Sequence, residues 1–172
     1  FNMLFEACAH HAHPAIERCA ECCSRLRQAV RLYRGEFLRG MFVNDSPLLE
    51  EWISWRRQQY QQHTLMALPT LTSRAELLAD YDQAEHYAQQ QLAIDNLREE
   101  AYQQLMRARM LMGRRQEALV AYELCRKALK DELDVAPSTA TQQLYEQIKH
   151  EQFGQTQFLA SDRKETVAVP KI

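Results

Sequence analysis

The residues best suited to chemistry in this sequence are the cysteines and histidines near its start. Cys19 and Cys22 form a C-x-x-C pair, and thiolate and imidazole groups are the ligands that zinc prefers, four of them around a tetrahedron. The cluster from which ligands could come is Cys8, His10, His11, His13, Cys19, Cys22 and Cys23. The predicted zinc ligands are Cys8, His13, Cys19 and Cys22. Such a site would staple helices together rather than catalyse a reaction.

A purely structural role explains the same cysteines. Cys19 and Cys23 fall on the apolar stripe of a predicted helix, which would leave Cys22 as a neutral neighbour and the histidines in a loop. A single C-x-x-C pair is a weaker signal than two such pairs at finger spacing. Five cysteines is an odd number, with four of them crowded into one segment, so a reducing cytoplasm fits better than a secreted disulfide framework. Both interpretations, zinc binding and packing, stay open at this point.

Two tryptophans on one predicted helix could grip a partner. Trp52 and Trp55 lie on different faces of that helix, and packing is the simpler explanation, with Trp52 in the core and Trp55 at its rim.

A group of arginines near one predicted turn could meet an acidic partner or a phosphate. An ordinary solvated face, balanced by nearby glutamates, is the alternative. The arginines are Arg107, Arg109, Arg114 and Arg115. The residues chosen as a candidate partner surface are Trp55, Arg107, Arg114 and Arg115.

Catalytic motifs are missing from the sequence. It has no phosphate-cradling glycine loop, no H-E-x-x-H pair and no nucleophile elbow, and its four glycines stand alone. A non-enzymatic function without a cofactor is therefore expected, zinc being the one exception considered.

Helices must position all of these residues. Only 4 Gly and 5 Pro occur among 172 residues, and helix formers dominate. Ala84 and Ala118 each follow a short polar turn and lie 34 positions apart, which is the period of tetratricopeptide repeats. The sequence predicts an all-α, tetratricopeptide-like array of antiparallel helix hairpins with about seven helices.

The expected organisation is one helical domain over residues 1–153, in which 1–32 form an N-terminal helical extension. Pro69 predicts a kink or a break in the helix that follows Pro47, because proline lacks an amide proton and its ring clashes with the preceding turn. Asn96, three residues before Glu99, predicts a capping box. Residues 154–172 are expected to be a flexible tail, with 167–169 able to pair as a strand.

Charge and hydropathy exclude two classes of partner. The net charge of −2, with 21 basic residues among 23 acidic ones, gives no field that favours DNA. No stretch approaches the ~20 apolar residues of a membrane span. The sequence also begins without methionine and within an apolar run, which favours an excised piece of a longer protein.

Several motifs occur together between Leu26 and Ile148. They are Tyr33-Arg34-Gly35-Glu36-Phe37-Leu38, Trp52 with Arg57, residues 98–106, residues 113–119 with Tyr122, Cys125, Arg126 and Leu129, and residues 132–138. In this combination the sequence resembles a known family, the bacterial transcriptional activator domain of Streptomyces antibiotic regulatory proteins and related activators. Asn96 departs from the proline usual in the repeat, and Pro69 breaks a helix that relatives keep whole.

The resemblance implies a non-catalytic regulatory domain placed directly after a winged helix-turn-helix that reads DNA. DNA would be met only through that module, outside this sequence, while RNA polymerase and a second copy are the expected protein partners. Two other functions are considered: a repeat adaptor that binds an extended peptide or a signalling protein, and a metal-responsive sensor built on the cysteine–histidine cluster.

Overall fold

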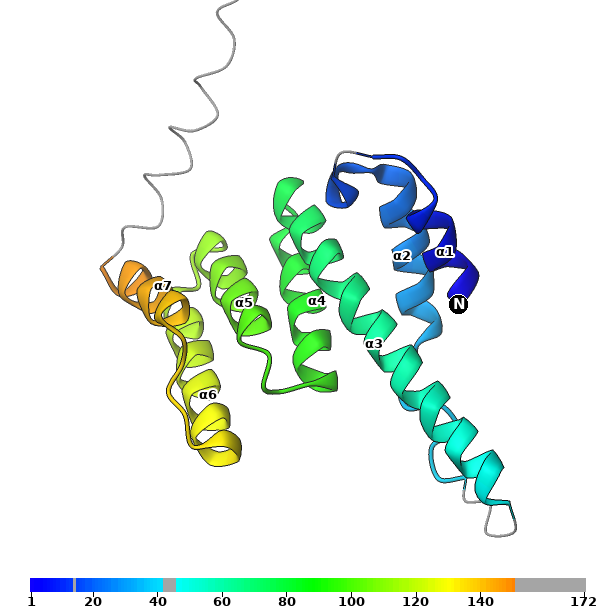
Figure 1. The fold of residues 1–172 in the computed structure, drawn as a ribbon. Coiled ribbons are helices and arrows are strands. Elements are labelled where there is room, and N and C mark those ends of the chain that lie inside the picture. Colours follow the sequence, from blue (N-terminus) through cyan, green and yellow to red (C-terminus); the bar gives the residue numbers. More distant parts are fainter. Residues whose placement is uncertain (14, 42–45, 151–172) are drawn as a thin grey trace, which may run out of the picture.

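Helix is the regular structure of this chain throughout the part that the computed structural model describes, residues 1–13, 15–41 and 46–150. These ranges contain no strand, and the elements follow one another as in Figure 1. They are α1 (Asn2–Ala9), the 3-10 turn η1 (Ile16–Arg18), α2 (Ala20–Leu32), α3 (Pro47–Leu77), α4 (Tyr81–Ile94), α5 (Glu99–Leu111), α6 (Arg115–Leu133) and α7 (Thr139–Lys149). The predicted all-α array of helix hairpins is confirmed. The predicted tail, 154–172, with its strand at 167–169, lies outside the described residues.

The repeat period in the sequence corresponds to two stacked helix pairs. Each of the helices α3 to α6 packs against the next one along the chain, and Figure 1 shows them side by side. Helices α4 and α6 begin at Tyr81 and Arg115, so their starts are separated by the same period as Ala84 and Ala118. Both alanines are fully buried, since a small side chain there lets two helices approach closely. The 34-residue period in the sequence therefore corresponds to one helix pair in the structure.

Matched turns separate the hairpins. Gly113 follows α5 with a φ of +74°, and Ala79, one repeat period earlier, follows α3 with a φ of +55°. After α5, the amide of Arg114 donates to the carbonyl of Arg109 at 2.8 Å. After α3, the amide of Asp80 donates to the carbonyl of Ala75 at 2.9 Å. Both turns thus have the hydrogen bond of a Schellman motif, which favours glycine at the left-handed position.

The core of the repeat is built from large and small side chains on successive helices. Six of its buried side chains are Tyr102, Leu105, Met106, Ala118, Tyr122 and Leu129. They fill the spaces between α4, α5, α6 and α7, so the packing of aromatic against small side chains forms the seams of the array.

Proline does not break α3. The helix runs unbroken from Pro47 to Leu77 with Pro69 inside it, so the predicted break is wrong. Leu65 and Leu68 before the proline and Leu71 after it are all buried. Continuity of that buried face outweighs the lost hydrogen bond, which costs ~3 kcal/mol in a helix interior.

The predicted capping box at Asn96 is also wrong. Helix α5 begins at Glu99, and Arg98 stands at the N-cap position without a side-chain cap bond. The carboxylate of Glu99 reaches α7 instead, where it accepts hydrogen bonds from the amide of Ser138 at 2.8 Å and from the hydroxyl of Thr141 at 2.6 Å. By contrast, Asp80 does cap α4, because its carboxylate accepts a hydrogen bond from the amide of Gln83 at 3.2 Å.

The N-terminal extension, 1–32, shares a core with the helices that follow. Cys22, Cys23 and Leu26 of α2 pack in one cluster with Leu68 and Leu71 of α3. Within this extension, α2 begins at Ala20, directly after the short η1 turn and Cys19. None of the helices in the described ranges combines the length and hydropathy that a bilayer crossing requires.

Candidate functional site

The cysteine–histidine cluster lies where the loop after α1 meets the start of α2. Cys22 stands in the first turn of α2, and Cys19 caps that helix, its sulfur accepting a hydrogen bond from the amide of Cys22 at 3.4 Å. The η1 turn lies between the loop after α1 and Cys19. Helix α3 holds this turn in place, because the guanidinium of Arg74 donates to the carbonyls of Glu17 and Arg18 at 3.3 and 3.2 Å. Local capping and one long-range anchor thus position the cluster.

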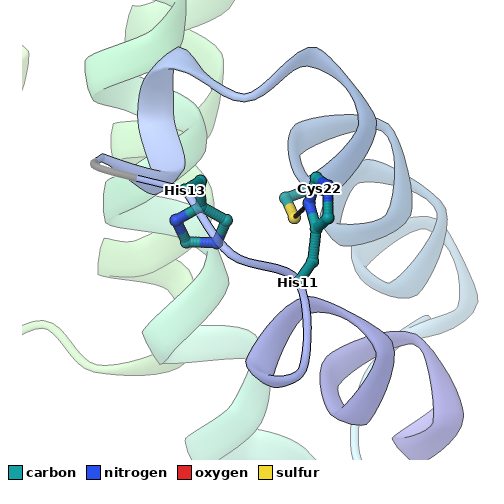
Figure 2. A group of neighbouring side chains, drawn as sticks. All are labelled: His11, His13 and Cys22. Atoms are coloured by element: carbon teal, nitrogen blue, oxygen red, sulfur yellow. Dashed lines mark hydrogen bonds between the residues drawn. The ribbon is translucent and has the colours of Figure 1, made fainter.

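Three ligand atoms converge there. One ring nitrogen each of His11 and His13 and the sulfur of Cys22 lie within 4.8 Å of one another. The Nδ1 of His11 is 3.1 Å from the sulfur of Cys22 and 3.5 Å from the sulfur of Cys19. Figure 2 shows the three converging side chains, with a dashed line joining His11 to Cys22. The cluster thus offers nitrogen and sulfur together.

Not all of the predicted zinc ligands take part in that convergence. His13 and Cys22 do, with Cys19 adjacent, but the sulfur of Cys8 points to the backbone and donates to the carbonyl of Cys22 at 3.6 Å. His11 is absent from the predicted ligand set, although it belongs to the wider cluster in the sequence. Residues 10–13 form a connection without helical periodicity, so spacing gave no signal to tell one histidine from another.

The two C-x-x-C thiols differ in pKa because their surroundings differ. The hydrogen bond from the amide of Cys22 lowers the pKa of the Cys19 thiol below its ordinary value. Burial raises the pKa of the Cys22 thiol to about 12. The carboxylate of Glu21 lies 3.8 Å from Nε2 of His11, on the side of the ring away from the sulfurs. The half-exposed thiol is therefore the more readily ionised of the pair.

A cleft of about 770 Å³ opens beside the cluster, between α1, the following loop and α3. His11, His13 and His63 line it together with apolar side chains such as Phe5 and Ile16. Nε2 of His13 and Nδ1 of His63 are buried and have no hydrogen-bond partner among the described residues. Buried polar atoms of this kind call for an explanation, such as a water or a bound ion.

A second candidate site is an exposed apolar surface at the start of α3. Its members are large hydrophobic side chains from the first turns of that helix and from the connection before it: Leu38, Met41, Leu48, Leu49, Trp52 and Trp55. We call this set the α3 patch. Figure 1 shows the first turns of α3 extending past the ends of α2 and α4. Contiguous exposed apolar patches on soluble domains commonly mark contacts with other proteins.

Trp52 was predicted to lie in the core, and that prediction is wrong. Trp52 is 45% exposed and Trp55 is 53% exposed. The guanidinium of Arg56 lies between them, 5.3 Å from the ring of Trp52 and 4.7 Å from that of Trp55. Helices α2 and α4 do not reach the first turns of α3 (Figure 1), so Trp52 packs only against the preceding connection, with its ring 6.3 Å from that of Phe37.

The predicted arginines make contacts inside the molecule. Arg114 and Arg109 both bind Glu85 of α4, the latter with 2.8 Å between Nε and Oε1. Burial alone would raise the pKa of Glu85, but the hydrogen bonds from the two arginines outweigh it and hold that pKa below the usual range. These ion pairs tie α4 to the turn between α5 and α6.

The other two arginines of the predicted partner surface are also engaged. Arg107 lies 3.6 Å from the carboxylate of Glu76 on α3. Arg115 donates to the carbonyl of Ile148 at 2.9 Å and also to that of Lys149, at the end of α7. Of the four residues chosen for that surface, Trp55 is the one whose side chain is mainly exposed.

Comparisons with known proteins identify the family. No curated protein and no solved structure matches the chain. The family model of the bacterial transcriptional activator domain matches residues 3–149, a range that includes the whole helical array from α2 to α7. The chain therefore belongs to the bacterial transcriptional activator domain family, which is a family of regulatory domains and not of enzymes.

Proposed function

We propose that this chain is a non-catalytic regulatory domain of a transcriptional activator, which docks another module through the α3 patch. The single observation that supports this best is the exposure of two tryptophans on a helix end that projects from the array. Tryptophan is enriched among the residues that dominate binding energy at protein interfaces. Leu48, Trp52 and Trp55 recur at steps of four and three residues, so they share one face of α3, and the prediction that the two tryptophans lie on different faces is wrong.

The occupant that we propose is the DNA-binding module that members of this family place ahead of the domain. Phe1 packs against α3, with ring centroids 5.2 Å from Tyr60 and 6.0 Å from His63. Tyr60 follows Trp55 by five residues, which is about 7.5 Å along the helix axis at the standard rise. A module joined before Phe1 would emerge beside the patch. RNA polymerase and a second copy of the chain are the alternative occupants.

A reporter assay tests both the role and the surface. The chain is joined behind a winged helix-turn-helix module of known operator, and promoter activation is compared with that of the module alone. We expect activation to require the chain and to fall at least tenfold in the double variant Trp52→Ser, Trp55→Ser. Leu124→Ser is the matched control, because Leu124 is a comparably exposed apolar residue on α6, at 51%. Equal activation with and without the chain would contradict the regulatory role.

Two further results would change the proposed surface or its proposed occupant. If the double variant activates like the wild type, the α3 patch is not the docking surface. Sedimentation of the chain alone identifies a second copy as the occupant, if the wild type dimerises and the double variant does not.

A further inference from the structure

We propose that His11, His13, Cys19 and Cys22 bind one zinc ion. This site differs from the set predicted from the sequence by having His11 in place of Cys8, and it is independent of the docking function proposed above. Two imidazole nitrogens and two thiolates are a donor set typical of structural zinc.

Two distances from His11 approach the nitrogen–sulfur edge of a zinc tetrahedron. With zinc–sulfur and zinc–nitrogen bonds of ~2.3 and ~2.0 Å, a tetrahedral nitrogen–sulfur edge is about 3.5 Å. Nδ1 of His11 lies 3.1 Å from the sulfur of Cys22 and 3.5 Å from that of Cys19. His13 supplies the remaining nitrogen, which lies within 4.8 Å of the other two converging donors. Figure 2 shows these first three ligands, and the sulfur of Cys19 would supply the fourth donor.

Neighbouring groups support the ligands in the ways that metal sites require. The Nε2 of His11, which faces away from the sulfurs, lies 3.8 Å from the carboxylate of Glu21. A carboxylate behind a ligating histidine fixes the ring and raises its basicity. The sulfur of Cys19 accepts a hydrogen bond from the amide of Cys22 at the start of α2, at 3.4 Å. Two of the four proposed ligands, His11 and Cys19, are therefore held by neighbouring groups.

The buried Nε2 of His13 supplies an independent indication. It has no hydrogen-bond partner among the residues that the structure describes, although it lines the cleft beside the cluster. A metal ion would satisfy this atom, and the cleft of about 770 Å³ gives the ion a path to it. Zinc bound there would tie the loop at residues 10–13 to the start of α2.

The test uses cobalt(II) as a spectroscopic substitute for zinc. The 172-residue chain is reduced, treated with a chelator and titrated with cobalt chloride. We expect visible d–d bands of tetrahedral intensity and a near-ultraviolet sulfur-to-cobalt band, saturating at one ion per chain and abolished by one equivalent of zinc. The melting temperature should rise with zinc and stay unchanged with magnesium. Absence of tetrahedral bands in the wild type would overturn the proposal.

Variants separate this ligand set from its neighbours. His13→Asn and Cys19→Ser replace partly exposed side chains, so these variants should fold and lose the tetrahedral spectrum. Cys8→Ser and Cys23→Ser are the matched controls and should retain it, because the sulfurs of Cys8 and Cys23 are directed to the backbone carbonyls of Cys22 and Ile16. Loss of the spectrum in Cys8→Ser together with its retention in Cys19→Ser would overturn the assignment of the fourth ligand.

Discussion

Large aromatic side chains are buried in the repeat and exposed at the start of α3. In the repeat, Tyr102 and Tyr122 are buried between helices, whereas Trp52 and Trp55 on the first turns of α3 are about half exposed. Helices α4 to α6 each have neighbours on two sides, but the start of α3 extends past the helices that cover the rest of it. Aromatic side chains of the regular repeat therefore contribute to its core, whereas both proposed binding sites lie in the N-terminal part.

The first test of this comparison uses two methionines. Met106 is fully buried in the repeat, whereas Met66 on α3 is 69% exposed. We expect Met106→Ala to lower the free energy of unfolding by about 3 kcal/mol, because a cavity remains in a close-packed core. Met66→Ala should change it by less than about 0.5 kcal/mol. Urea unfolding of both variants measures the difference, and similar losses would show that the two regions do not differ in this way.

The second test concerns two glutamates whose arginine partners offset the effect of burial to different extents. Glu85→Gln should destabilise the protein by about 2 kcal/mol at neutral pH, because Arg109 and Arg114 then lose their most buried anionic partner and keep only the more exposed Glu117 and Asp82. Burial raises the pKa of Glu76, an effect that the more distant Arg107 does not cancel, so Glu76→Gln should be neutral or slightly stabilising. An equal loss in both variants would contradict this account.

The pH dependence of that difference follows from the sign of each shift. The folded-state pKa of Glu85 is lowered, so its contribution is fully present above the unfolded value of about 4.3 and is lost as the pH falls through the folded value. The pKa of Glu76 is raised, so its unfavourable contribution above that pKa is relieved as the pH falls. Unfolding midpoints measured from pH 7 down to about pH 3 should therefore show the wild type and Glu85→Gln converging.

The third test exchanges the residues of the two matched turns. Ala79→Gly should stabilise the protein by about 1 kcal/mol, and Gly113→Ala should destabilise it by about the same amount, since only glycine adopts the left-handed conformation without strain. A methyl group at position 113 would meet nothing within 4 Å, so backbone strain alone is measured. Thermal unfolding of both variants suffices. Shifts of the same sign would show that the turns are not equivalent.

The smallest expected effect is at the α3 patch. Trp52→Ser and Trp55→Ser should each lower the free energy of unfolding by about 0.5 kcal/mol, because half-exposed rings contribute little beyond their contact with Arg56. Tyr102→Ser in the repeat should cost several times more, about 3 kcal/mol. A loss at Trp52 comparable to that at Tyr102 would mean that the patch is part of the core.

How far the candidate sites could be predicted depended on whether the deciding contacts were local. The C-x-x-C pair identified Cys19 and Cys22 because both lie within one turn of a helix start. The choice between His11 and Cys8 depended on the path of the loop after α1, which Arg74 of α3 anchors from a distant part of the sequence. Arg109 and Arg114 were considered for contact with another molecule because the sequence does not show that Glu85, on another helix, lies beside them.

The sequence by itself determined the helical repeat, since small and aromatic residues at the tetratricopeptide period, together with caps such as Asp80 and turns such as Gly113, specify hairpins through local contacts. Only the tertiary structure decided that α3 continues through Pro69, that Trp52 is exposed, and that Glu99 binds α7 rather than capping its own helix. Each of these outcomes depends on which helix lies opposite. Propensity and spacing describe a helix alone, whereas burial and hydrogen-bond partners are set by its neighbours.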